Sequence, residues 1–171
     1  MTTKAPNDIY GFLKDEKWRK LLKTYCVNVT ESWRSRNGFG MNAELIRKSD
    51  KKKIAEIQDD GRGGAMKITR FHKLGGPTSS QTEEYEEFNR ELSELPSDEP
   101  VNDEIVIAIL ADIAEMKKIS EKKKNGLRIV YVDKDDKLYQ YDFPKGTSID
   151  RATAHIREKM KDAMIVNEVF A

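Results

Sequence analysis

The spacing of apolar residues changes from a helical to an extended period near residue 24. Between residues 8 and 23 the apolar positions recur at three- and four-residue intervals, which predicts one or two short helices. Beyond them, apolar residues alternate with polar ones, as in a half-buried strand. The predicted apolar face of this strand carries Tyr25, Val27, Val29 and Trp33.

Further β segments follow this strand. Asn37-Gly38 predicts a hairpin, because the tight type I′ turn needs a positive φ at both central residues. A strand follows it, a polar turn covers 48–51, and alternating segments over 52–58 and 66–71 indicate two more strands. These segments predict an antiparallel meander of about four strands.

Two helices are expected after the meander. Ser80 and Glu83 have the S-x-x-E spacing of a capping box, which predicts a helix that continues to Leu95. Asn102 is a suitable N-cap for the next helix, whose hydrophobicity favours a central position. Its expected apolar stripe consists of Ile105, Ile109, Ile113 and Met116, and Val106 and Leu110 widen it.

The C-terminal part combines both periods. Segments 127–132 and 138–143 flank a polar run and predict a second hairpin. Thr147 or Ser148 is expected to cap a last helix, and 165–170 is expected to form a closing strand.

These elements predict an α+β fold: an antiparallel meander packed with helices, then a hairpin, a helix and a short strand. A chain of 171 residues fits one domain, so we expect a single domain over 1–171. It would comprise a basic N-terminal helix and meander (1–76), a helical segment (77–126) and a ββαβ segment (127–171).

Charge is strongly segregated although the net charge is only +1. Residues 1–76 contain 17 basic and 9 acidic side chains, whereas 77–104 contain 1 basic and 10 acidic ones. The favoured interpretation is that the two segments pair within the fold. The alternative is that the acidic helix imitates nucleic-acid charge toward a basic protein.

A single cysteine, Cys26, excludes an intramolecular disulfide and a thiolate cluster, which favours a reducing compartment. The sequence shows no apolar run suited to a signal peptide or a membrane span. We therefore expect a soluble cytoplasmic protein without a membrane association.

No catalytic or metal-binding motif is recognisable. The only imidazoles, His72 and His155, lie 83 positions apart. The acidic run that begins at Asp133 lacks the glycine and glutamate of a calcium loop, so a polar turn is favoured. Asp59 and Asp60 precede a glycine, which favours turn chemistry over magnesium binding. We expect no enzyme, no catalytic residue, no metal and no cofactor.

Two glycine- and arginine-rich segments, 34–40 and 59–64, are the best candidates for a binding site. Arginine forks beside stacking aromatic rings suit single-stranded nucleic acid or a nucleotide signal. The alternative is a buried Trp33 with solvated arginines. The predicted site residues are Trp33, Arg34, Arg36, Asn37, Phe39, Arg62 and Arg70.

The segments 33–41 and 55–64, together with Asn167-Glu168, resemble small uncharacterised proteins of tailed bacteriophages. The resemblance implies an accessory protein in the cytoplasm of an infected bacterial cell. The expected function is therefore non-enzymatic inhibition or sequestration of a host factor, such as a bacterial defence protein or its nucleotide signal. The alternative is a nucleotide or single-stranded nucleic-acid binding protein.

Overall fold

The structure, a computed structural model, describes residues 9–71, 76–78, 80–95, 101–121 and 125–169. The chain forms two compact units, one of residues 20–111 and one of residues 9–19 with 112–169. Each unit has its own antiparallel sheet, which confirms the α+β class. The prediction of one domain over the whole chain stays a prediction.

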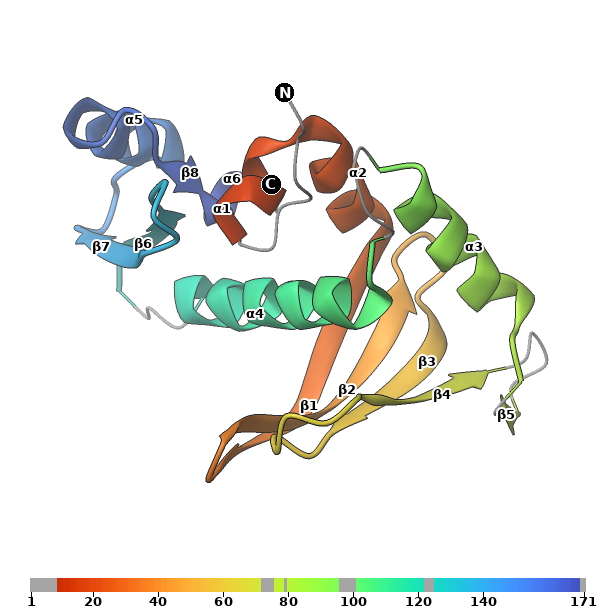
Figure 1. The fold of residues 1–171 in the computed structure, drawn as a ribbon. Coiled ribbons are helices and arrows are strands. Elements are labelled where there is room, and N and C mark those ends of the chain that lie inside the picture. The colour runs from red at the N-terminus through yellow and green to blue at the C-terminus, as the bar shows by residue number, and fades with distance from the viewer. Residues whose placement is uncertain (1–8, 72–75, 79, 96–100, 122–124, 170–171) are drawn as a thin grey trace. The chain divides into compact units, whose positions relative to one another are not determined.

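The first unit is built on a five-stranded meander in the order β1-β2-β3-β4-β5, one strand more than expected (Figure 1). Neighbours in sequence pair antiparallel throughout, as the alternating segments predict. Its elements are β1 (Tyr25–Ser35), β2 (Gly38–Arg47), β3 (Lys52–Asp59), β4 (Lys67–Phe71), β5 (Pro77–Thr78) and α3 (Glu83–Ser93).

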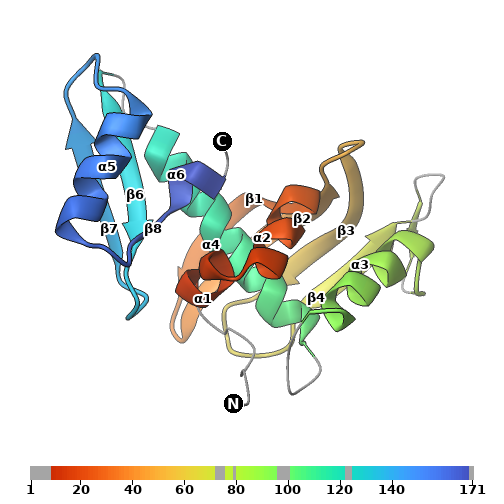
Figure 2. The same cartoon turned by 90° about the horizontal axis from the view of Figure 1, so that it is seen from above.

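The acidic helix α3 lies beside β3 and β4 (Figure 2). Its N-cap is Thr82, whose side chain accepts a hydrogen bond from the Tyr85 amide, so the prediction of Ser80 at this position was wrong. The Lys52 ammonium lies 2.6 Å from the Glu84 carboxylate. This ion pair joins the basic meander to the acidic helix and supports the self-neutralising interpretation of the charge segregation.

The core of the first unit lies between α3 and the sheet. Phe88 packs with its ring centroid 5.0 Å from that of Tyr25 in an edge-on arrangement. Leu45 and Ile57 are also fully buried. A chain that alternates apolar and polar residues over β2 and β3 therefore buries one face of the sheet under the helix.

A β-bulge halfway along β1 reverses which side chains of the strand point to each face of the sheet. Val29 pairs with Ala43, but Glu31 pairs with Asn42, so Thr30 is an extra residue in β1. An inserted residue reverses the alternation beyond it. The expectation that Trp33 shares a face with Val29 was therefore wrong.

The second unit contains a three-stranded sheet in the order β7-β6-β8. The predicted hairpin is confirmed, and Ser148 is the N-cap of the last long helix. The closing strand is limited to two residues and is followed by a short helix; residue 170 lies outside the described part. The elements are α1 (Ile9–Lys14), β6 (Leu127–Val132), β7 (Leu138–Phe143), α5 (Ile149–Lys159), β8 (Met164–Ile165) and α6 (Val166–Val169).

The unit boundaries fall inside the two remaining helices, α2 (Glu16–Thr24) and α4 (Asp103–Glu121). Asn102 accepts a hydrogen bond from the Glu104 amide at 2.8 Å, as expected of an N-cap. Ile109, Ile113 and Met116 are buried as the stripe predicts, whereas Ile105 is 42% exposed. Within the described residues, no helix is long and apolar enough to cross a membrane.

Candidate binding site at the hairpin tip

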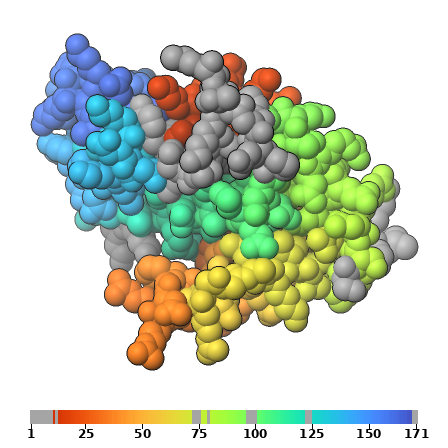
Figure 3. All heavy atoms as spheres, in the orientation of Figure 1, coloured from red at the N-terminus to blue at the C-terminus, as the bar shows by residue number. Residues whose placement is uncertain are grey.

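The two glycine- and arginine-rich segments meet at one end of the first unit's sheet. One forms the end of the β1–β2 hairpin and the other forms the β3–β4 loop (Figure 1). Their exposed atoms lie side by side, in orange and yellow, in Figure 3. We call this the tip surface; its exposed side chains include Trp33, Arg34, Arg36, Phe39 and Arg62, and Asn37 and Asp60 are exposed as well.

A side-chain hydrogen bond and a close backbone approach hold the β3–β4 loop against the hairpin. The Ser35 hydroxyl donates a hydrogen bond to the Gly61 carbonyl. Gly61 has φ 72°, and a Cβ at this position would lie 2.5 Å from the Gly40 nitrogen. Only glycine fits both the conformation and the close approach. Ser35 was missing from the predicted site, although a serine just before a turn is a recognised signal for such bonding.

The hairpin turn differs from the predicted type I′ turn. Ser35 pairs with Gly38, so the two loop residues are Arg36 and Asn37. Neither has a positive φ, and Gly38 follows them with φ 153°. The backbone amide of Asn37 donates a hydrogen bond to the Ser35 hydroxyl at 3.3 Å. Asn37 therefore shapes the turn, and Arg36 occupies its outermost part.

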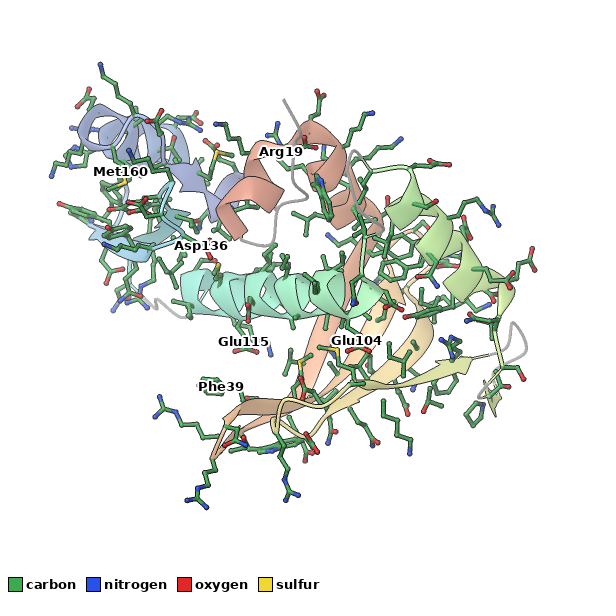
Figure 4. The ribbon with its side chains drawn as sticks, viewed as in Figure 1. Arg19, Phe39, Glu104, Glu115, Asp136 and Met160 are labelled. Atoms are coloured by element: carbon green, nitrogen blue, oxygen red, sulfur yellow. The ribbon has the colours of Figure 1, made fainter. Side chains whose placement is uncertain are left out.

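The two aromatic rings of the tip surface lie on opposite faces of the hairpin. Trp33 is opposite Gly40 in the register, and its indole ring covers that glycine: a Cβ there would be 2.3 Å from the ring. Phe39 is opposite Arg34, whose guanidinium carbon lies 5.4 Å from the phenyl centroid. Figure 4 shows the Phe39 ring standing clear of the strand. The exposed fractions are 39% for Trp33 and 67% for Phe39.

The three arginines of the tip surface remain available to an anion. Among the described residues, no acidic side chain forms an ion pair with Arg34, Arg36 or Arg62. The nearby carboxylates of Asp59 and Asp60 accept hydrogen bonds from the amides of Gly61 and Arg62, each at 2.8 Å. These two aspartates serve the loop, as the turn interpretation expected.

Arg70 lies outside the tip surface, so the structure does not bring it together with the other predicted site residues. It belongs to β4, and its guanidinium lies 4.6 Å from the Tyr85 ring centroid. The Tyr85 hydroxyl donates to Asp103 at 2.7 Å, and burial raises the pKa of this phenol. Arg70 therefore belongs to the packing between β4 and α3.

The remaining polar candidates have structural contacts. Asp133 Oδ1 accepts bonds from two amides of its own turn, each at 2.9 Å, and these bonds lower the pKa of the carboxyl. His155 lies against the Tyr141 and Phe143 rings, with centroid separations of 5.6 and 5.7 Å. His72 lies outside the described residues. Within the part of the chain that the structure describes, no group of three or more His, Cys, Asp and Glu side chains is suited to a metal.

Comparisons with protein-family models, with curated proteins and with solved structures found no match.

Proposed function

We propose that the protein is a non-enzymatic binding protein whose tip surface holds single-stranded nucleic acid. The proposal rests on one observation: the tip surface combines three exposed arginines, which have no acidic ion-pair partner among the described residues, with two exposed aromatic rings, one of which lies under Arg34. Cationic side chains attract phosphates, and aromatic rings stack with bases. A duplex keeps its bases stacked on one another, so exposed rings favour a single strand.

Each side chain of the tip surface has a role in this proposal. Arg36 and Arg62 project from two adjoining loops and would contact successive phosphates. One side of the Trp33 indole covers Gly40, and the exposed remainder would stack with a base. The Arg34 guanidinium already lies over the Phe39 ring. From there this planar group would stack with a base or bind a phosphate.

Titration of the full chain with short labelled oligonucleotides tests the proposal. Trp18 is 1% exposed, so a ligand-induced change in tryptophan emission would report on Trp33. Three phosphate contacts predict a slope of about −2 for log K against log salt, because each contact to a single strand contributes about −0.7. A cyclic dinucleotide in a parallel titration separates a nucleotide signal from an extended strand.

Three substitutions sharpen the test. Arg36→Ala and Arg62→Ala should each make the salt slope shallower by about 0.7. Trp33→Ala should cost about 1–3 kcal/mol of binding free energy, the contribution of one stacked base. Arg90→Ala, an exposed arginine on α3, is the matched control and should change neither quantity. Unchanged binding in both tip-arginine variants would refute the site.

A phage-type inhibitor of a host factor, acting in the cytoplasm of an infected bacterium, is the second candidate. The exposed Phe39 beside Arg34 favours it, because aromatic and arginine side chains dominate the energetics of protein interfaces. The acidic helix is not part of this proposal, since Glu84 and Glu87 already pair with the meander. A host protein retained from lysate by the wild type and by Phe39→Ala alike would contradict this use of the tip surface.

A further inference from the structure

Strand β7 is an edge strand with one open side. In the second unit's sheet, β6 separates it from β8, and within the described residues no strand pairs with its outer side. Its pairing with β6 is continuous from Leu138 to Phe143. An open strand edge offers unpaired amides and carbonyls to another strand.

The side chain of Asn167 reveals which backbone groups of β7 face outward. Its Oδ1 accepts a bond from the Val130 amide at 2.8 Å, and its Nδ2 donates to the Arg128 carbonyl at 3.0 Å. These two residues of β6 therefore point away from β7. In an antiparallel pair, alternate residues point to opposite sides, so Ile129 bonds across to Tyr141.

The same alternation leaves Leu138, Gln140 and Asp142 with amides and carbonyls directed outward. A second observation agrees: the Asp133 amide donates to the Lys137 carbonyl at 3.1 Å, so the odd-numbered residues face the partner strand. The strand lacks the devices that usually block an edge, namely proline, lysine and a bulge. The open edge of β1, by contrast, contains the bulge at Thr30.

We propose that β7 pairs antiparallel with β7 of a second copy of this chain, centred on Gln140. In this register Gln140 faces itself across the two-fold axis, and Leu138 faces Asp142 of the second copy. Each outward-directed residue of the strand then lies opposite an outward-directed residue of the second copy. Tyr139 also lies opposite the second copy's Tyr141, an aromatic pairing that stabilises sheets.

The neighbouring registers are less favourable. A shift in one direction brings Asp136 opposite Asp142 of the second copy, and like charges directly opposite each other destabilise a sheet. A shift in the other direction brings Pro144 opposite Leu138, and proline has no amide hydrogen to donate. Asp142 is the only charged residue of β7, and its carboxylate lies 2.7 Å from the Arg128 guanidinium of the same copy. In the centred register it therefore faces no like charge.

Sedimentation equilibrium of the full chain measures the proposed dimer. Gln140→Pro removes both central amide donors but leaves the β6 ladder intact, because this amide points outward. We expect a dimer for the wild type and for Gln140→Ala, and loss of the dimer for Gln140→Pro. A wild type that stays monomeric at its highest soluble concentration, or a Gln140→Pro variant that dimerises normally, would overturn the proposal.

Charge variants provide a test that does not depend on proline. Because Gln140 faces itself, Gln140→Glu and Gln140→Lys should both weaken the dimer, up to about fivefold for a like-charged pair. Leu138 is 46% exposed, so substitutions there preserve the fold. Leu138→Asp should weaken the dimer more than Leu138→Lys, because residue 138 faces Asp142 of the second copy and only the aspartate adds a like charge there. Equal dimer affinities for these two variants would refute the register.

Discussion

Gly61→Ala tests the contact that joins the β3–β4 loop to the hairpin. A Cβ at this position would lie 2.5 Å from the Gly40 nitrogen and 2.7 Å from the Phe39 carbonyl carbon. Both neighbours are backbone atoms, so one of the two segments must shift. The φ of 72° adds conformational strain for any residue with a Cβ.

These two effects have separable magnitudes. The left-handed conformation costs a residue with a Cβ about 1–2 kcal/mol, and the steric overlap costs about 1–3 kcal/mol, as in an overpacked core. Gly61→Ala should therefore lower the free energy of unfolding by about 2–5 kcal/mol, the sum of both effects. Displacement of the loop should also weaken oligonucleotide binding, because Arg62 is adjacent.

Two nearby glycines supply matched controls for urea denaturation. Gly63 has φ 83° but no atom within 4 Å of its Cβ position, so Gly63→Ala should lose only about 1–2 kcal/mol. Gly64 has open space and no left-handed φ, so Gly64→Ala should be neutral or slightly stabilising. If Gly61→Ala and Gly63→Ala lose equal stability, the loop is not packed against Gly40 in the way described.

Three other substitutions test the packing of each unit. The Lys52 hydrogen bond lowers the pKa of Glu84. Its stabilising effect is therefore fully present above the unfolded pKa of about 4.3 and is lost as pH falls through the folded value. Glu84→Gln should cost about 1.5–3 kcal/mol at neutral pH, and the difference from the wild type should shrink in acid denaturation series. Tyr85→Phe removes the bond to Asp103 and should cost about 0.5–1.5 kcal/mol by urea denaturation, because a half-buried hydrogen bond is lost. Asn167→Ala leaves two β6 backbone groups unpaired, so amide hydrogen exchange in β6 should accelerate.

The meander and the long helices follow from local sequence signals. Alternation of apolar residues over β2 and β3 marks the buried face, and it matches the observed burial of Ala43, Leu45 and Ile57. Asn102 and Ser148 are N-caps, as predicted, because a side-chain oxygen beside free amides is a strictly local arrangement. The sequence could therefore predict the order and type of most elements.

Other features depend on contacts that a local pattern does not contain. The choice of Thr82 over Ser80 as N-cap depends on where Tyr85 is buried against the sheet. The division into two sheets depends on which strands find partners, and the apolar period alone does not specify this. Arg70 follows the glycine-rich loop closely in the sequence, which suggested a place in the site. Its contact with the Tyr85 ring is instead set by the packing of α3 against the sheet.

The tip surface combines a predictable and an unpredictable part. Its composition is visible in the sequence, but the facing of Trp33 depends on the extra residue Thr30 in β1. Strict alternation would have placed Trp33 on the face of Phe39, where both rings would point to the same side. The bulge directs the indole to the opposite face, and Gly40 leaves room for the ring there. The two features act together, and this explains why a hairpin with one buried face carries an exposed aromatic ring on each side.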